Sequence, residues 1–187
     1  MEVKTLKKAL FLTFFVGLLI FGSLTPISAS AEESKGTNTP ASAQVEYYDA
    51  NNKLVSVESY TEEKQATSTP STKFFSLAAS KKGVSYYDFG KTTFSNYIWV
   101  KGGYAFKNPG AMSIELNNRP KQFEVRMYAS NKKTYIGKGV AKNASGWVPF
   151  DWRSLRKKGS SYTFKLVSAA NSGKITVNNG TLEYNVN

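Results

Sequence analysis

The chain has 187 residues, and 25 Lys and Arg against 13 Asp and Glu give it a formal net charge of +12. It contains no Cys and no His, which excludes disulfides, Cys/His zinc sites, thiol nucleophiles and Ser-His-Asp triads. The high aromatic content, 14%, favours a packed β-protein over a disordered chain.

Residues 1–31 have the pattern of a secretory signal peptide. A lysine-bearing start precedes an unbroken apolar run from Ala9 to Phe21, and small residues then end in Ala29-Ser30-Ala31, an A-x-A cleavage site. The run is shorter than the roughly 20 apolar residues of a membrane-spanning helix. We therefore expect a secreted, extracellular protein that can associate with the cell wall. The absence of Cys from an exported chain favours a Gram-positive source.

The next segments are a leader, a hairpin and a linker. Residues 32–43 are small and polar and predict a disordered leader, and residues 61–73 predict a Thr/Ser-rich linker. Between them, residues 44–60 hold two β-prone runs around a turn-rich stretch, which predicts an acidic β-hairpin. Three roles are open for the hairpin: two further strands of the sandwich, which we favour, a cleavable cover over the basic domain, or a flexible stalk.

Charge is distributed unevenly along the chain. Residues 32–63 carry 2 basic and 7 acidic residues, a net charge of −5, whereas residues 64–187 carry 20 basic and 5 acidic residues, a net charge of +15. Such asymmetry suggests binding to a polyanion or an intramolecular cover over the basic face. The alternative is that exposed lysines keep a β-protein soluble and protect its sheet edges.

Residues 74–187 predict a basic all-β domain, an antiparallel β-sandwich or jelly roll of roughly 8–11 short strands. Turns rich in Gly, Asn and Pro separate the strands, and Asn179-Gly180 is typical of a two-residue hairpin turn. The expected strands are 74–79, 84–89, 96–101, 104–107, 111–116, 122–129, 134–140, 147–152, 161–168, 174–177 and 181–186.

Period-two alternation along these strands assigns their faces. One side of four strands is apolar and predicts the core, namely Met112, Ile114, Leu116, Phe123, Val125, Met127, Ala129, Tyr162, Phe164, Leu166, Leu182, Tyr184 and Val186. The opposite sides are expected to face solvent and carry Glu115, Glu124, Arg126, Lys165 and Glu183.

Few residues have the pattern of a catalytic or metal site. Asp88 and Asp151 lie among aromatic residues and are the only carboxylate pair that we consider for acid–base chemistry. The chain has no phosphate-binding glycine loop and no calcium-loop motif. We therefore expect a protein that is not an enzyme and that uses no metal and no cofactor. A secreted hydrolase that uses Asp88 and Asp151 is the weakest alternative.

Two segments combine aromatic and basic residues and predict ligand-binding surfaces. In residues 84–107, inward-facing Ile98 and Val100 would leave Tyr97, Trp99 and Lys101 on one outer face, with Tyr104 beyond them; the alternative places Trp99 in the core. In residues 147–158, Trp152 is followed by a basic loop suited to phosphate groups. The candidate ligand-binding residues are Tyr97, Trp99, Lys101, Tyr104, Trp152, Arg153, Arg156 and Lys157.

These features predict a monomeric, non-catalytic binding protein whose partner is an anionic cell-wall polymer or glycan. An anionic membrane surface is a further candidate partner. Nucleic acid fits the charge but is less available to an exported protein. The main alternative function is a secreted cationic antibacterial toxin, a bacteriocin-like antagonist of neighbouring cells.

Overall fold

The structure is a computed structural model, and it describes residues 42–62 and 83–187. These residues all belong to one compact unit, Asn38–Asn187. The expected signal peptide, nearly all of the leader and linker, and the expected strand 74–79 lie outside the described residues.

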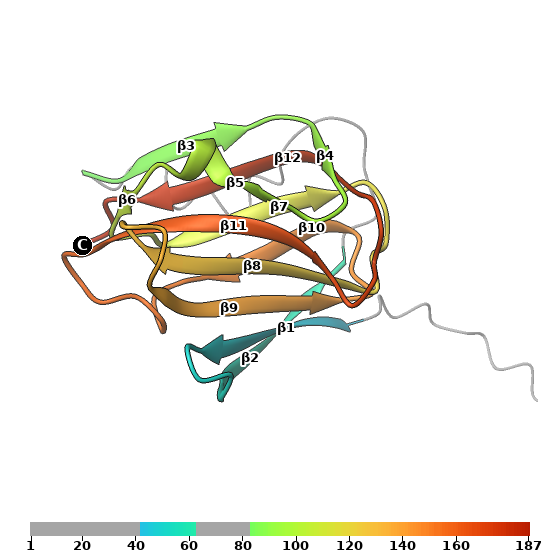
Figure 1. Ribbon diagram of the computed structural model, residues 1–187, viewed down its shortest axis with the longest axis horizontal. Coiled ribbons are helices and arrows are strands. Elements are labelled where there is room, and N and C mark those ends of the chain that lie inside the picture. Colours follow the sequence, from blue (N-terminus) through green and yellow to red (C-terminus); the bar gives the residue numbers. More distant parts are fainter. Residues whose placement is uncertain (1–41, 63–82) are drawn as a thin grey trace, which may run out of the picture. The chain divides into compact units, whose positions relative to one another are not determined.

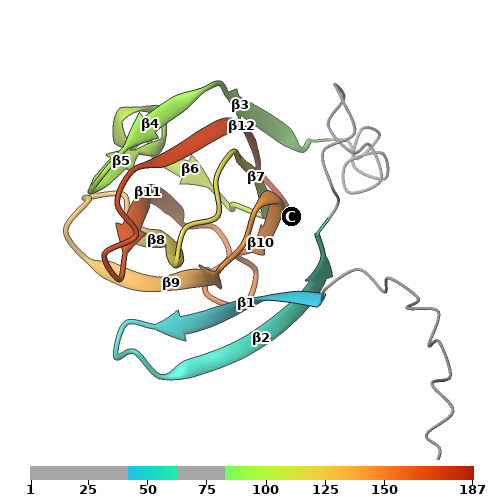
Figure 2. The ribbon, with the colours of Figure 1, turned by 90° about the vertical axis from the view of Figure 1, so that its right-hand side faces the viewer.

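The described residues form two antiparallel sheets that pack face to face as a β-sandwich, as the sequence predicts (Figures 1 and 2). The larger sheet has seven strands in the order β2-β1-β9-β8-β11-β5, with β6 also paired to β11. Its strands are β1 (Ser42–Asp49), β2 (Leu54–Thr61), β5 (Tyr97–Trp99), β6 (Phe106–Lys107), β8 (Gln122–Ala129), β9 (Tyr135–Lys142) and β11 (Ser161–Ala169).

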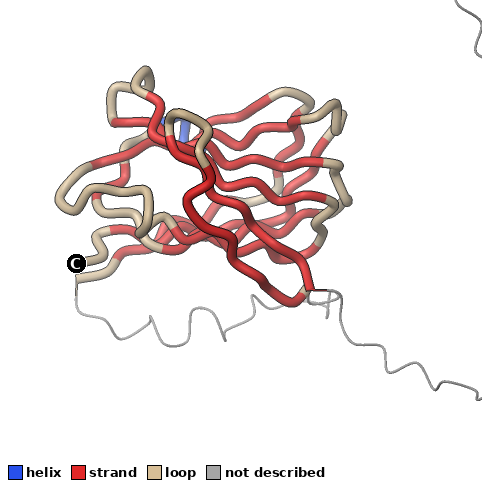
Figure 3. Tube along the Cα trace, turned by 90° about the horizontal axis from the view of Figure 1, so that it is seen from below, coloured by secondary structure: helices blue, strands red, loops and turns tan. Residues whose placement is uncertain are grey.

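The smaller sheet has five strands in the order β10-β7-β12-β3, with β4 also paired to β12. Its strands are β3 (Ser85–Phe89), β4 (Thr92–Phe94), β7 (Ala111–Leu116), β10 (Gly146–Asp151) and β12 (Ile175–Tyr184). A short 3-10 turn, η1 (Val100–Gly103), follows β5. The loops gather at the two ends of the strands (Figure 3).

The core lies between the two sheets and contains most of the residues that alternation predicts. Phe123, Met127 and Phe164 from the larger sheet are fully buried, as are Met112 and Leu182 from the smaller sheet. Aromatic rings link the layers, because Phe106 of β6 contacts Phe164, Tyr87 and Tyr184. Of the predicted core residues, Ala129 and Tyr184 are only partly buried.

The predicted hairpin turn at Asn179-Gly180 is wrong, because both residues lie inside the continuous strand β12. This strand pairs with β4 in its first half and with β3 in its second half, while β7 runs along its other side. Gly180 has a packing role there. A Cβ at this position would overlap the ring of Phe89, so glycine allows the neighbouring strand to place its ring over the backbone.

Two carboxylates expected to face solvent are instead buried. The side chains of Glu124 and Glu183 point away from the core, as alternation predicts, yet they are 2% and 4% exposed. Basic side chains cover both, since Arg126 and Lys138 pair with Glu124 and Arg153 pairs with Glu183. Alternation predicted correctly which face of the strand each carboxylate lies on. It could not predict that basic side chains would bury the two carboxylates on that face.

The hairpin at residues 44–60 is part of the sandwich, the role that we favoured. Strand β1 pairs with β9 as well as with β2, and so it extends the larger sheet (Figure 2). Tyr47 of β1 is fully buried, and its hydroxyl accepts a hydrogen bond from the backbone N–H of Asp151 in the smaller sheet at 2.6 Å. The same hydroxyl donates to Glu58 at 3.2 Å. The hairpin therefore ties the two sheets together at one side.

Opposite charges also hold the hairpin against the basic part of the chain. Glu46 pairs with Lys142 at 2.8 Å, and Glu62, just beyond β2, pairs with Arg119 at 2.5 Å. Hydrogen bonds from Lys142 and Tyr48 hold the pKa of Glu46 below its usual range. The acidic residues of this segment therefore form ion pairs with basic residues of the same chain.

Candidate functional site

The outer face of the larger sheet carries a row of basic and aromatic side chains. In antiparallel sheets, residues opposite one another on paired strands point to the same face. Tyr48 is paired with Lys138, Lys138 with Arg126, Arg126 with Lys165, and Lys165 with Trp99. This row therefore crosses five strands, β1-β9-β8-β11-β5, and three of its five members are cations.

Three aromatic rings surround the lysine in this row. The Nζ atom of Lys165 lies 4.4 Å from the ring centres of Tyr97 and Trp99 and 5.0 Å from that of Tyr128. These distances are within the range for cation–π attraction, which holds the ammonium among the rings. We call Lys165, Tyr97, Trp99 and Tyr128 the Lys165 cluster.

The rings of the Lys165 cluster support one another and remain accessible. Trp99 and Tyr128 meet edge to face with their centres 5.4 Å apart, and Tyr135 extends the group from β9. Tyr97 is 49% exposed, and the other three members of the cluster are partly exposed. Burial raises the pKa of Tyr135 to about 12, so its hydroxyl stays protonated at neutral pH. The result is an aromatic surface with a positive charge at its centre.

A buried carboxylate fixes the two neighbouring cations. One oxygen of Glu124 accepts from Arg126 Nε at 2.7 Å, and the other accepts from Gln122 at 2.7 Å and from Lys138 at 3.0 Å. Burial alone would raise the pKa of Glu124, but the hydrogen bonds from Lys138 and Arg126 outweigh it and lower the pKa. Glu124 is therefore ionised at neutral pH and holds both basic groups in fixed positions on the sheet.

Of the two orientations that the sequence leaves open for Trp99, the structure has the outward one. Ile98 packs against the core and Val100 is buried, so Tyr97 and Trp99 lie on the outer face of the larger sheet. Lys101 departs from that pattern because its φ of 46° ends the strand alternation. Its ammonium lies over the rings of Tyr104, at 4.3 Å, and Tyr87, at 4.9 Å. Lys101 and Tyr104 therefore form a separate contact.

Trp152 is fully buried, and we remove it from the candidate ligand-binding residues. Its ring stacks on Phe150 and packs against Phe164 and Tyr47, so it belongs to the core. Its indole N–H is buried without a hydrogen-bond partner among the residues that the structure describes. The physical reason is the alternation of β10, which points Val148 and Phe150 inward and continues through Trp152.

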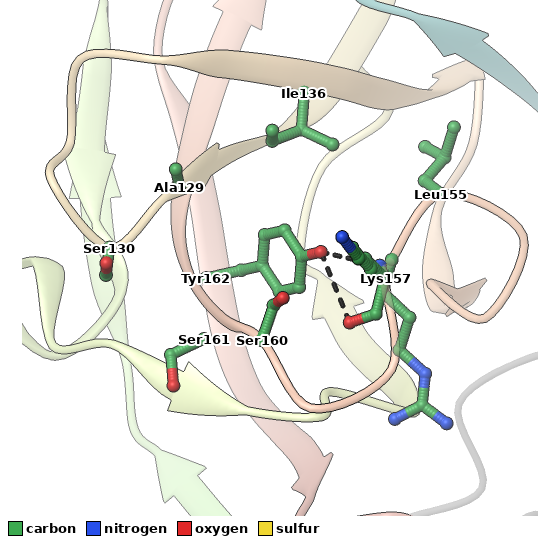
Figure 4. Close-up of a pocket in the computed structure, with 9 residues that line it drawn as sticks. Ala129, Ser130, Ile136, Leu155, Lys157, Ser160, Ser161 and Tyr162 are labelled. Carbon is green, nitrogen blue, oxygen red and sulfur yellow. Dashed lines mark hydrogen bonds between the residues drawn. The ribbon is translucent and has the colours of Figure 1, made fainter.

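Of the three remaining basic candidates, Arg153 forms ion pairs with carboxylates of the protein, whereas Arg156 and Lys157 line a cavity. Arg153 makes ion pairs with Asp151 at 2.6 Å and with Glu183 at 3.1 Å, so its charge is neutralised within the protein. Arg156 and Lys157 line an open cavity of about 630 Å³ at one end of the sandwich (Figure 4). These two residues therefore stay candidates. They lie in the loop between β10 and β11 and are not part of the Lys165 cluster.

The carboxylate pair considered for hydrolysis does not have the spacing that glycoside hydrolysis needs. Asp88 lies on β3 and Asp151 on β10, at opposite edges of the smaller sheet. Three steps between strands of about 4.8 Å separate them by at least about 14 Å, whereas the two glycosidase carboxylates lie about 5–9.5 Å apart. Asp88 accepts a hydrogen bond from Thr181, and Asp151 pairs with Arg153.

Four residues of the candidate site, namely Tyr48, Tyr128, Tyr135 and Lys138, were not predicted from the sequence. Arg126 and Lys165 were expected on an outer face, but not as neighbours of Trp99. Alternation in residues 122–129 could have placed Tyr128 on the same face as Arg126. The order of strands in the sheet, which brings β5, β11, β8 and β9 together, is not encoded in any local pattern.

No family model, no curated protein and no solved structure matches this chain. Within residues 42–62 and 83–187, no group of His, Cys, Asp and Glu side chains is arranged to hold a metal ion. No helix in these same residues has the length and hydropathy of a membrane span. The fold defines the class of protein: an antiparallel β-sandwich with a basic and aromatic outer face on its larger sheet.

Proposed function

We propose that this protein is an exported, non-catalytic binding protein that attaches to an anionic glycan polymer of the cell surface. The polymer would lie on the outer face of the larger sheet. The observation that carries this proposal is the Lys165 cluster, together with Arg126 and Lys138 in the same row.

The chemistry of the face suits such a polymer in two ways. Exposed aromatic rings offer flat apolar surfaces on which sugar rings can pack. Arg126 and Lys138 share the single carboxylate of Glu124, so with Lys165 the row keeps a net positive charge. That charge can attract phosphate or carboxylate groups along the polymer, because charge-assisted hydrogen bonds to anions are among the stronger polar contacts. A row that crosses five strands is about 19 Å long, at about 4.8 Å per strand spacing, and so could contact several units of an extended polymer.

The shape of this region favours a polymer over a small molecule. Small-molecule sites are usually enclosed clefts lined by apolar side chains. The cation–aromatic row lies on an outer sheet face, where side chains stand side by side, and Tyr97 is half exposed. A long ligand can obtain affinity from repeated weak contacts on such a surface.

Co-sedimentation with purified cell walls tests the proposal. Walls with and without their anionic polymer would be compared across a salt series, using the protein and two variants, Trp99→Ala and Lys165→Gln. We expect binding that needs the polymer, falls as salt rises and is weakened about tenfold by either substitution. Lys174→Gln removes one charge from the β11–β12 turn and is the matched control, which should bind like the unchanged protein.

Three results would contradict the proposal. Equal binding to intact and stripped walls would mean that the anionic polymer is not the ligand. Binding that Trp99→Ala and Lys165→Gln leave unchanged, in variants whose thermal melts remain cooperative, would mean that the outer face is not the binding surface. Absence of any wall binding, with killing of neighbouring cells instead, would favour the bacteriocin-like antagonist.

A further inference from the structure

The cavity at one end of the sandwich has the chemistry of a second binding site, independent of the Lys165 cluster. Figure 4 shows its position between the β8–β9 turn and the loop that joins β10 to β11. One side of the cavity is apolar, formed by Ala129, Ile136, Leu155 and the ring of Tyr162. The other side is polar and carries Ser130, Ser160, Ser161, Arg156 and Lys157. No carboxylate is among these lining residues.

The basic loop beside the cavity is held in place by its backbone. The carbonyl of Trp152, whose side chain is anchored in the core, accepts from the N–H groups of Leu155 at 3.2 Å and Arg156 at 2.9 Å. The N–H of Lys157 donates to the hydroxyl of Tyr162 at 2.5 Å, and the N–H of Gly159 donates to Asn108. The loop is therefore ordered before any ligand arrives, which lowers the entropic cost of binding.

The cations of this loop have no acidic partner within the described part of the chain. Arg156 donates through Nη1 to the carbonyl of Val186 at 3.0 Å, which positions the guanidinium but leaves its charge uncompensated. None of the ion pairs between described residues includes Arg156, Lys157 or Lys158. Three consecutive positive charges repel one another, and a bound anion would relieve that repulsion.

The serine side chains add neutral donors near these cations. The hydroxyls of Ser130, Ser160 and Ser161 belong to the lining of the cavity, together with Arg156 and Lys157. Hydroxyls and guanidinium groups together match the several acceptor oxygens of a phosphate group. The apolar side of the cavity could then hold the organic group to which the phosphate is attached.

We infer that this cavity is a binding site for a phosphate ester, with the phosphate on Arg156 and Lys157 and the ester group against Ile136 and Leu155. The same chemistry occurs in a soluble or polymer-borne phosphate ester and in a phospholipid headgroup. A cavity of about 630 Å³ is large enough for one such group. The inference does not rest on the proposed function, because it uses other residues and another part of the fold.

Titration of the isotopically labelled protein with small phosphates, followed by amide NMR, tests the inference. Inorganic phosphate and phenyl phosphate are the probes, and inorganic phosphate lacks the ester group. We expect both to shift the amide signals of Lys157, Ser160 and Ser161, with phenyl phosphate binding several-fold more tightly because its ring contacts the apolar side. Vesicles of phosphatidylglycerol and of phosphatidylcholine form a separate arm, in which selective binding to the former would identify a lipid headgroup as the source.

A pair of double variants provides the control. Arg156→Gln with Lys157→Gln should weaken binding of phenyl phosphate by about tenfold or more, since charge-assisted contacts are lost. Lys132→Gln with Lys133→Gln removes the same charge from the neighbouring β8–β9 turn, outside the cavity lining, and should weaken it far less. Equal losses in the two variants would overturn the site and leave only a diffuse charge effect. Absence of shifts at the three amides with either probe would also overturn it.

The outcomes separate this inference from the proposed function. If the double variant at Arg156 and Lys157 loses phosphate binding but still binds walls, the cavity is a phosphate site that wall binding does not need. If Trp99→Ala loses wall binding but still binds phosphate, the outer face is the wall-binding surface and the cavity is not involved.

Discussion

Replacing Glu124 by Gln tests whether the buried carboxylate organises the outer face. Glutamine keeps the shape of the side chain but has only one acceptor oxygen, so its amide nitrogen must face donors of either Arg126 or Lys138. In the native protein both oxygens are used, by Arg126 at 2.6 Å and by Lys138 at 3.0 Å. A hydrogen bond to a charged group contributes about 1.5–3 kcal/mol.

The expected loss follows from these contacts. The side chains of Arg126 and Lys138 are 36% and 19% exposed, so both can recover part of their hydration when the carboxylate is lost. We therefore expect Glu124→Gln to lower the free energy of unfolding by about 2–3 kcal/mol at pH 7, below the 3–5 kcal/mol of a fully buried broken pair. Asp88→Asn is the control, because Asp88 is exposed and its hydrogen bond from Thr181 can persist; it should cost about 0.5 kcal/mol or less.

The effect of Glu124→Gln should also depend on pH in a defined direction. The pKa of Glu124 is lowered in the folded protein, so its contribution is fully present above the unfolded pKa, about 4.3, and is lost as pH falls through the folded pKa. In urea melts, the difference in the free energy of unfolding between the native protein and Glu124→Gln should therefore be smaller at pH 3 than at pH 7. A difference that stays constant or grows at pH 3 would refute the reasoning.

Three further substitutions test the packing. Phe164→Ala should destabilise the protein by about 3–5 kcal/mol in urea melts, and a loss below about 1 kcal/mol would mean that this residue is not in the core. Gly139→Ala would place a Cβ 2.6 Å from the ring of Phe150, so we expect a loss of about 1–3 kcal/mol, and an unchanged melt would contradict that close approach. Tyr47→Phe leaves the amide of Asp151 without its acceptor and should cost about 1–3 kcal/mol; a neutral effect would argue against the link between the sheets.

The fold class and much of the core could be predicted from the sequence because alternation is a local property. Phe123, Val125 and Met127 occupy every second position of one strand, and all three are fully buried. The turn at Asn179-Gly180 was predicted wrongly for a nonlocal reason. Gly180 accommodates the ring of Phe89 from a strand about 90 residues earlier, and no local pattern distinguishes that use from a turn.

The candidate site was predicted only in part, for a related reason. Tyr97 and Trp99 could be placed on an outer face from their own strand. Their partner Lys165 lies on β11, and only the pairing of β5 with β11 brings it among the rings. Trp152 shows the opposite error, since its aromatic and basic sequence context suggested a binding surface while its ring lies in the core.

The three tryptophans of the chain provide the most direct test of the central claim, that an anionic glycan polymer binds the outer face of the larger sheet. Trp99 lies on that face, Trp147 is paired with Glu115 on the outer face of the smaller sheet, and Trp152 is buried. Their indole N–H signals can be followed by NMR while purified anionic wall polymer is added. The account predicts that the Trp99 signal shifts and broadens while the other two stay in place. A response centred on Trp147, or none at Trp99 when the polymer is bound, would contradict it.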